Sequence, residues 1–188
     1  MMRSSSLFGF AAPFALLICA PVLHAQRFGN LEVLAPDFPT PQVVIEKMLQ
    51  LAHLKPGEMV YDLGSGEGRI VIAAAREFKA RAVGIELSPE LCKLATMHIK
   101  ALGLEDRVKI IHANLLKVDL SPADVVTIYL LTASNELLRP NLERDLKPGA
   151  RVVSHDYQIR GWKPSAVEKV SAEGRSRTIY VYDIGPKK

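Results

Sequence analysis

The sequence predicts an α/β fold built on a mainly parallel sheet of five strands, with an antiparallel hairpin attached at the C-terminal end. Short apolar runs of strand type alternate with segments whose apolar residues recur at helical spacing. After residue 165 this alternation stops, and two strand-like runs flank a turn at residues 172–174. The 188 residues, 48% of them apolar and 23% charged, suit one domain with one core.

The strands follow one another at regular intervals. The parallel strands are expected over residues 59–63, 82–86, 108–111, 125–129 and 151–154, and the hairpin strands over residues 167–170 and 178–182. Each is a short run rich in Val, Ile and other residues that favour strands. The pattern therefore predicts seven strands.

Four helical segments are expected between these strands. The first begins with Thr40 as its N-cap and Pro41 at its first position. The second follows a glycine-rich turn, and the third is capped by Ser88. The fourth covers residues 135–146 and is expected to break and restart at Pro140.

The N-terminal residues form an expected leader. Arg3 is the only charged residue before Arg27, and most of the stretch between them is apolar. A basic start, an apolar stretch and a small residue at the cut are typical of a secretory signal, here residues 1–25. Residues 26–188 then form the folded domain. Export to the periplasm, an uncleaved membrane anchor, and a leader that is not used and leaves the protein in the cytoplasm stay open as alternatives.

Cysteine, histidine and charge patterns exclude several protein classes. The chain has only Cys19 and Cys92, which excludes a disulfide scaffold and a cysteine zinc cluster. The five histidines show no ligand spacing, so no metal is expected. The net charge of +4 comes from 24 basic and 20 acidic residues without any run of like charges. We therefore expect no nucleic-acid partner.

A glycine-rich motif follows the first strand and opens the second helix. It runs from Asp62 as Asp-Leu-Gly-Ser-Gly-Glu-Gly-Arg. A dinucleotide fingerprint needs G-x-G-x-x-G, but the third glycine here comes one residue early, at Gly68. The Gly-Lys-Ser/Thr of a P-loop is absent. The pattern D-x-G-x-G-x-G is instead the first motif of S-adenosylmethionine (SAM) enzymes.

Each part of this motif has an expected contact with SAM. The amides of the loop, which contains Gly64, Ser65, Gly66 and Gly68, suit the carboxylate of SAM because they lie at a helix N-terminus. Asp62 suits the cationic end of SAM, directly or through water. The sequence thus predicts SAM as the cofactor.

Two later strand ends support a SAM site. Glu86 ends the second strand, 24 residues after Asp62, where an acidic side chain can accept both ribose hydroxyls. Asn114 follows the third strand and is expected at the adenine amino group, while Leu87 or Leu115 packs on the ring. With SAM as cofactor, five parallel strands and a terminal hairpin predict a class I SAM-dependent methyltransferase, with a seven-stranded Rossmann-like sheet.

Over residues 36–184 the chain resembles the Rossmann-type protein-lysine N-methyltransferases of archaea and bacteria, which lack a SET domain. The shared features are Phe-Pro-Thr-Pro at residue 38, the glycine motif, Tyr-Leu-Leu at residue 129, Asn-Glu at residue 135, Ser-His at residue 154 and Gly-Trp at residue 161. The chain is similar in the same way to the mitochondrial lysine methyltransferases that act on an ATP synthase subunit and on the adenine nucleotide carrier. It departs from the family at Asp37, where an aromatic residue is usual, and in its leader.

The resemblance implies that the chain methylates lysine side chains of proteins. Ile-Tyr-Leu-Leu after the fourth strand replaces the Asn/Asp-Pro-Pro-aromatic motif of many enzymes that methylate amides or adenine. Tyr129 is expected to orient the amine, and Thr40 and Phe38 to close over the site. His155, with Asp156, could accept a proton through water, and Trp162 is expected at the edge of the substrate groove.

Two other functions stay open at this point. The chain could methylate nitrogen or oxygen of a small molecule, although it has no large insertion to cap one. It could also be a SAM-binding protein without turnover. The expected partner is a protein with an accessible lysine, the expected state is a monomer, and no membrane insertion is expected beyond an uncleaved leader.

Overall fold

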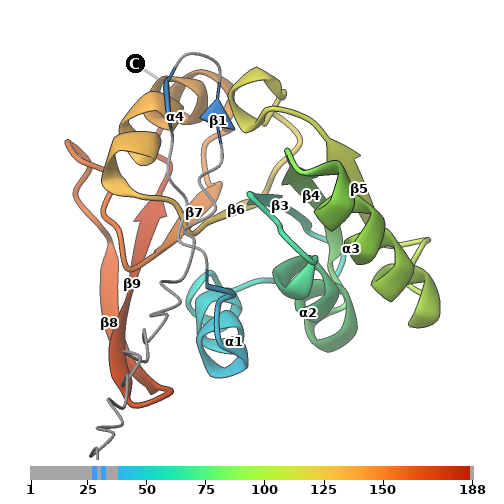
Figure 1. Cartoon of the computed structure of the whole chain (residues 1–188). Coiled ribbons are helices and arrows are strands. Elements are labelled where there is room, and N and C mark those ends of the chain that lie inside the picture. The colour runs from blue at the N-terminus through green and yellow to red at the C-terminus, as the bar shows by residue number, and fades with distance from the viewer. Residues whose placement is uncertain (1–26, 29–30, 33–37, 187–188) are drawn as a thin grey trace, which may run out of the picture.

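The computed structural model describes residues 27–28, 31–32 and 38–186 (Figure 1). The expected leader and Asp37 lie outside the described residues. Two short strands that were not predicted, β1 (Arg27–Phe28) and β2 (Leu31–Glu32), pair with each other antiparallel. In the part of the chain that the structure describes, no helix is both long and apolar enough to span a bilayer.

The main sheet has seven strands, as predicted. Its parallel strands are β3 (Met59–Leu63), β4 (Arg81–Glu86), β5 (Val108–His112), β6 (Val125–Ile128) and β7 (Arg151–His155), and its antiparallel hairpin is β8 (Ala166–Ala172) and β9 (Arg175–Asp183). The order across the sheet is β5-β4-β3-β6-β7-β9-β8. The chain therefore runs outward from β3 to β5 and returns to the other side of β3 at β6. Open α/β sheets hold their ligands at the carboxyl ends of the strands where the direction reverses in this way.

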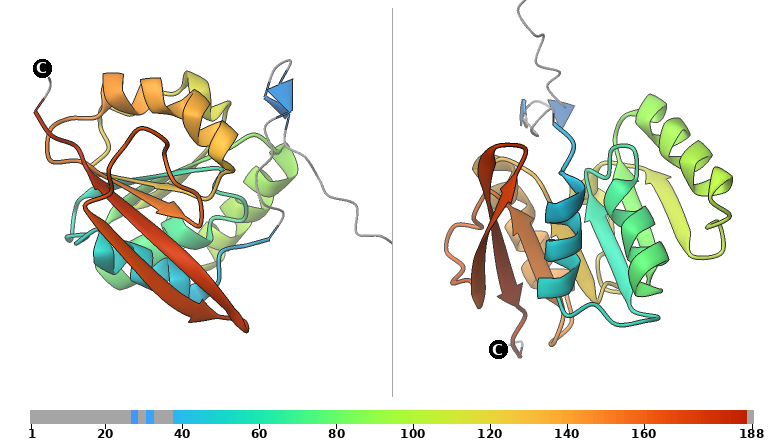
Figure 2. Two further views of the ribbon diagram at one scale, coloured as in Figure 1. Left: turned by 90° about the vertical axis from the view of Figure 1, so that its left-hand side faces the viewer. Right: turned by 90° about the horizontal axis from the view of Figure 1, so that it is seen from below.

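Helices cover both faces of the sheet (Figure 2). α1 (Gln42–Leu51), α2 (Arg69–Phe78) and α3 (Pro89–Ala101) lie on one face, and η1 (Leu115–Lys117) and α4 (Thr132–Asp145) lie on the other. Successive residues of a strand point to opposite faces. Val60 accordingly packs in the core beneath α1 and α2, while its neighbour Tyr61 packs in the core beneath α4. The two cores hold the sheet rigid between the helices.

The start of α1 differs from its prediction. The helix begins one residue later than expected, Pro41 occupies the N-cap position, and no side chain caps the helix. Thr40 Oγ1 instead lies 3.2 Å from His155 Nδ1, on a strand end that is distant in sequence. A hydroxyl can bond either to its own helix or to a distant side chain, and here the tertiary contact is made. The prediction of Thr40 as N-cap is therefore wrong.

α4 is one continuous helix, although a break at Pro140 was predicted. It also begins three residues earlier than expected, at Thr132. Pro140 is exposed, whereas Leu138 and Leu142 on either side of it are fully buried against the sheet. Burial of these leucines stabilises the helix on both sides of the proline, and Glu136, whose carbonyl loses its partner, is an exposed residue.

Candidate active site

The glycine loop joins the carboxyl end of β3 to the first turn of α2. Gly64, Gly66 and Gly68 have φ angles of 85°, 53° and 81°, in the left-handed region that glycine adopts without strain. A Cβ at Gly66 would meet nothing within 4 Å, so the loop presents bare backbone to open space there. The loop has the shape that allows a ligand to approach closely.

The loop amides, however, already have protein acceptors. Gly64 N and Ser65 N donate to Ile85 O, and Gly68 N donates to Ser65 O. Gly66 N donates to a carboxylate oxygen of Glu86 at 2.8 Å. Three of these hydrogens fix the loop to the end of β4 and that of Gly68 closes the loop on itself, and contact of the loop amides with the SAM carboxylate stays a prediction.

Two buried carboxylates lie at the ends of neighbouring strands. Asp62 is 3% exposed and accepts a hydrogen bond from Thr127 Oγ1 at 2.8 Å. Burial raises the pKa of Asp62 from 3.8 to about 7; the Thr127 bond opposes this shift, and the negative charge of Glu86 adds to it. A carboxylate with so high a pKa gains more from a cationic ligand than a solvated one does.

Glu86, 1% exposed, ends β4 beside this carboxylate. Its Oε1 accepts hydrogen bonds from Leu87 N and Ser88 N, both at 2.9 Å, and its Oε2 accepts the bond from Gly66 N. These bonds fix the carboxylate where the ribose of SAM is predicted. Contact with the ribose stays a prediction.

Gly84 brings β4 close to the loop. A Cβ at this position would lie 2.5 Å from Ser65 Oγ and 2.7 Å from a methyl of Ile110. Only glycine leaves room for Ser65 there. The sequence shows Gly84 within a strand motif, but its role emerges only from the packing of the loop on β4.

The predicted adenine-side residues also have structural contacts. Asn114 Oδ1 accepts a hydrogen bond from Leu116 N at 2.9 Å and thereby caps η1. Leu115 is 4% exposed and belongs to the core beneath α4, whereas Leu87 is half-buried. Leu87 is therefore the better placed of the two to pack on an adenine ring, and the adenine contact of Asn114 stays a prediction.

The residues at this site fit SAM. Ser65 Oγ is buried and has no hydrogen-bond partner, which leaves a polar atom for a ligand at the loop. Asp62 and Glu86 suit a ligand that carries an ammonium, a sulfonium and two ribose hydroxyls. The same two carboxylates would repel the pyrophosphate of a dinucleotide, so they disfavour a dinucleotide as the ligand.

Replacement of Glu86 by Ala is expected to weaken SAM binding at least tenfold, or about 1.4 kcal/mol. The change removes both the predicted ribose acceptor and the acceptor that fixes the loop. Calorimetric titration of SAM into the variant measures the effect, with exposed Glu105→Ala as the control. Unchanged affinity in Glu86→Ala would refute the assignment.

The three residues predicted around the acceptor amine come together. Tyr129 directly follows β6, and its ring stacks on that of His155 with the centroids 3.9 Å apart. Thr40 Oγ1 lies 3.2 Å from His155 Nδ1. Thr40, Tyr129 and His155 are called the acceptor group below.

Strand register places the acceptor group beside the glycine loop. Leu63, the last residue before the loop, pairs with Ile128, and Ile128 pairs with Ser154. Tyr129 and His155 are the next residues along their strands. The SAM site and the acceptor group therefore share the carboxyl edge of the sheet, where methyl transfer needs them.

His155 is fully buried, and this decides its charge. Burial lowers the pKa of His155 from 6.5 to about 4, although the Asp156 carboxylate opposes the shift. The imidazole is therefore neutral at physiological pH. A base with a pKa near 4 accepts a proton from an ammonium only at high free-energy cost, which argues against the predicted proton-accepting role of His155.

Two residues near the acceptor group were not predicted. Arg177 of β9 donates from one guanidinium nitrogen to Asp156 Oδ2 at 2.9 Å and to the Tyr129 hydroxyl at 3.4 Å. Asn135 of α4 is fully buried, and its amide donates to the carbonyls of Tyr157 and Gln158, which fixes the chain after β7. Asn135 belongs to a motif that the resemblance contains, whereas no sequence signal marks Arg177.

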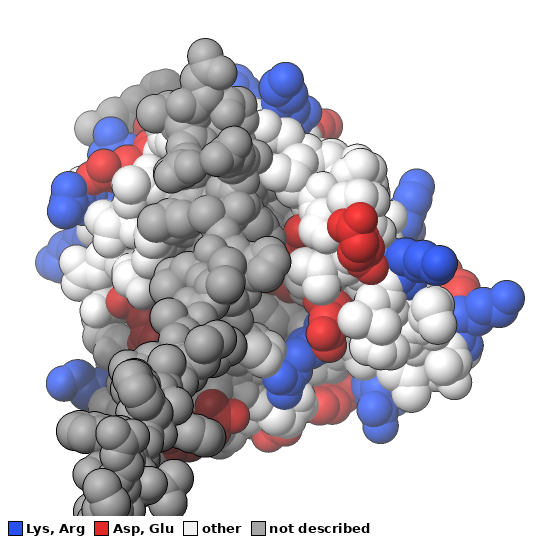
Figure 3. Space-filling model, in the orientation of Figure 1, with Lys and Arg blue, Asp and Glu red and all other residues white. Residues whose placement is uncertain are grey.

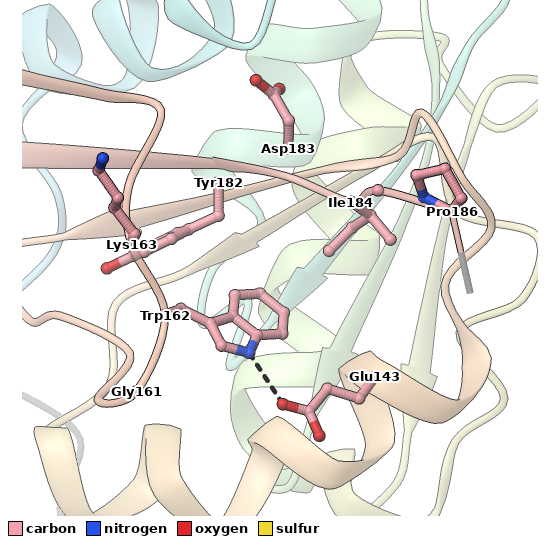
Figure 4. Close-up of a pocket in the computed structure, with 9 residues that line it drawn as sticks. Glu143, Gly161, Trp162, Lys163, Tyr182, Asp183, Ile184 and Pro186 are labelled. Atoms are coloured by element: carbon pink, nitrogen blue, oxygen red, sulfur yellow. Dashed lines mark hydrogen bonds between the residues drawn. The ribbon is translucent and has the colours of Figure 1, made fainter. Parts of the chain in front are cut away.

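Trp162 contacts residues of α4 and β9 (Figure 4). Its indole N–H donates to Glu143 at 2.9 Å, and its ring meets that of Tyr182 edge-on. Tyr182 pairs with Val152 near the beginning of β7, whereas the acceptor group lies at the end of that strand. Trp162 thus lines a hollow of about 370 Å³ away from the acceptor group, and its place at the edge of the substrate groove stays a prediction.

Comparison with known proteins gives consistent matches over this domain. A family model described as the ANTKMT methyltransferase domain matches residues 62–166. A protein-lysine N-methyltransferase of Saccharolobus islandicus is 46% identical over 154 residues, 81% of this chain and 96% of that protein. The adenine nucleotide translocase lysine N-methyltransferase of Mus musculus is 39% identical over 140 residues, 74% of this chain and 59% of that enzyme.

A similar solved structure carries a different description. It is an RNA methyltransferase from Salinibacter ruber in complex with S-adenosyl-L-homocysteine, 45% identical to this chain with a TM-score of 0.73. The match covers 79% of this chain and 94% of that one. The descriptions of these relatives agree on methyl transfer and differ in the class of acceptor.

Proposed function

The chain belongs to the family of ANTKMT methyltransferase domains and is a SAM-dependent methyltransferase, and from this premise we propose that its acceptor is a lysine side chain of a protein. The observation that carries the proposal is the acceptor group, an uncharged and partly aromatic cluster at the carboxyl edge beside the glycine loop. An aromatic wall suits the apolar stem of lysine, and hydroxyls suit its amine.

The chemistry needs placement more than covalent help from the protein. When bound, SAM would supply a methyl group already activated on a sulfonium for the amine nitrogen, with S-adenosylhomocysteine as its product. The protein holds the amine in line with that methyl group and excludes water. It also has to receive the amine without its proton. With a pKa of about 10.4, removal of this proton at pH 7.5 costs about 4 kcal/mol, and an aromatic surface reduces the cost by lowering the pKa.

The rate of methyl transfer is expected to rise with pH between pH 6.5 and 8.5, a range in which His155 does not titrate. Because the pKa of His155 is lowered to about 4, this residue is neutral on both sides of pH 7 and adds no step there. The ionisation that remains is that of the acceptor amine, so kcat/KM for the acceptor should rise about tenfold per pH unit from 6.5 to 8.5. The measurement uses saturating SAM, so that protonation of Asp62 does not enter. A plateau beginning near pH 6.5 would show a histidine base instead.

An RNA acceptor is the alternative that the Salinibacter ruber relative raises. RNA binding needs lysines and arginines gathered on one face to contact phosphates. On the face visible in Figure 3, basic and acidic side chains are interspersed instead of gathered by sign. Arg177, the basic residue at the acceptor group, is held by Asp156. These features favour a protein acceptor.

Transfer of a labelled methyl group separates the candidate functions. The protein is incubated with tritiated SAM and a cell extract, and the macromolecular label is tested for release by protease and by ribonuclease. Label that only protease releases supports the proposal. Label that only ribonuclease releases, or label confined to small molecules, contradicts it, and SAM binding without any transfer indicates a binding protein without turnover.

For the leader we propose export or membrane anchoring, because residues 1–25 combine a basic start with an apolar stretch. SAM is made in the cytoplasm, so such a location would require a supply of SAM outside it. N-terminal sequencing of the native protein together with cell fractionation tests the proposal. An intact N-terminus on a protein found only in the cytosolic fraction would overturn it.

A further inference from the structure

The two ring nitrogens of His155 face different kinds of group. Nδ1 lies 3.2 Å from the hydroxyl oxygen of Thr40, which can either donate or accept. Nε2 makes no hydrogen bond of good geometry, and Asp156 Oδ2 lies 3.4 Å from it. In a neutral imidazole only one nitrogen carries the proton, and its surroundings decide which one. The charges around the ring therefore determine the direction of the bond to Thr40.

The carboxylate of Asp156 selects the tautomer. With the proton on Nε2, a partly positive hydrogen faces the carboxylate; with the proton on Nδ1, a lone pair would face it at the same distance. The Nε2–H form is therefore favoured, and Nδ1 must then accept the hydrogen bond. The hydroxyl of Thr40 becomes the donor, and its lone pairs are the part that remains for another partner.

The hairpin fixes Asp156 in this position. Its Oδ2 accepts a bond from Arg177 at 2.9 Å, and its Oδ1 accepts one from Thr178 N at 2.8 Å. The backbone N–H of Asp156 donates in turn to Thr178 O at 2.7 Å, and the residue has a left-handed φ of 60°. A non-glycine residue in this region persists only where its surroundings hold it. The carboxylate therefore cannot turn away from His155 without breaking contacts with β9.

We propose that Asp156 and Arg177 are positioning residues that hold His155 in its Nε2–H form and so turn the Thr40 hydroxyl to accept an N–H of the acceptor amine. Held by this bond and by Tyr129, the amine directs its lone pair toward the methyl group. The proposal rests on the proposed function for the identity of the amine. The tautomer and the direction of the Thr40 bond do not depend on that identity.

The first test is a nitrogen-15 NMR spectrum of the ligand-free protein, with the signals of His155 assigned from a His155→Gln variant. We expect a neutral ring with a protonated, pyrrole-like Nε2 and an unprotonated, pyridine-like Nδ1. A ring with the proton on Nδ1, or a doubly protonated ring at pH 7, overturns the proposal. This readout needs neither an acceptor nor a folded variant of Asp156, so it stands apart from any failure to find a methylated lysine.

The second test is a double-mutant cycle of Thr40→Val and Asp156→Ala, with exposed Asp183→Ala on the same hairpin as the control. Each single variant is expected to lower kcat at least tenfold and to change the Kd of SAM less than twofold, because neither residue belongs to the SAM site. The double variant should lose no more than the single variants, since both act through one hydroxyl. The proposal is overturned if the loss of kcat in the double variant is the product of the two single losses, or if kcat is unchanged in Asp156→Ala.

Discussion

Replacement of Asp62 by Asn is expected to make the folded chain more stable at pH 8 and to weaken its binding of SAM at least a hundredfold. The side chains of Asp and Asn have nearly the same shape, and Thr127 can donate to the amide oxygen of Asn as it donates to the carboxylate of Asp62. The change removes a buried negative charge that the ligand needs and the fold does not. Loss of one partner of a buried charged contact costs about 2–5 kcal/mol, and a hundredfold corresponds to about 2.7 kcal/mol.

The sign of the stability change follows from the pKa of Asp62. Because the pKa in the folded chain is raised from 3.8 to about 7, the stability that Asp62 contributes is present below pH 3.8 and is lost as the pH rises through 7. Asp62→Asn should therefore raise Tm at pH 8 by at least 2 °C, or about 1 kcal/mol, and change it little near pH 4. Thermal unfolding at both pH values measures this, with exposed Asp106→Asn as the matched control. A lower Tm at pH 8 would contradict the burial argument.

Replacement of Gly84 by Ala is expected to destabilise the chain and to displace the glycine loop. The added methyl would lie 2.5 Å from Ser65 Oγ and 2.7 Å from Ile110, closer than packed atoms approach. Overpacking of this kind costs about 1–3 kcal/mol, which lowers Tm by about 2–12 °C in a chain of this size. Binding of SAM should weaken as well, because Ser65 can move away only by moving the loop.

A second substitution tests the cause of this effect. Ser65→Gly removes the Ser65 atoms that the new methyl meets and leaves only the contact with Ile110, so the double variant Gly84→Ala/Ser65→Gly should be more stable than Gly84→Ala alone. Gly185→Ala is the control, because a Cβ there meets nothing within 4 Å. Denaturation curves of the four variants measure the differences. If Ser65→Gly fails to rescue Gly84→Ala, the cause lies elsewhere than in the contact with Ser65.

Features written in local sequence were predicted correctly. The glycine motif, the acidic residue that ends β4 and the alternation of strands and helices each depend on neighbours a few residues apart, so they identify the sheet and predict where SAM binds on it. Thr40, Tyr129 and His155 also meet, because each of them ends or follows a strand or precedes a helix at the carboxyl edge.

Features that depend on distant contacts could not be predicted. Thr40 has the signature of a helix cap, yet it bonds to His155, 115 residues away. Arg177 reaches Asp156 only because the register of β9 on β7, in which Ile179 pairs with His155, places it there. The loop amides were expected to face a ligand, but Glu86 and Ile85 accept their hydrogens. In each case a hydrogen bond to a residue distant in sequence determines the role of the side chain or amide, and the local sequence does not show that bond.

Tandem mass spectrometry of proteins methylated by this chain tests the central claim most directly. The protein is incubated with an extract of its own cells and SAM that carries a deuterated methyl group, beside a parallel reaction with Asp62→Asn. We predict deuterated methyl groups on the side-chain nitrogen of lysine in the first reaction and far fewer in the second. Deuterated methyl groups on RNA nucleosides, on small molecules or on other side chains, with none on lysine, would contradict the account.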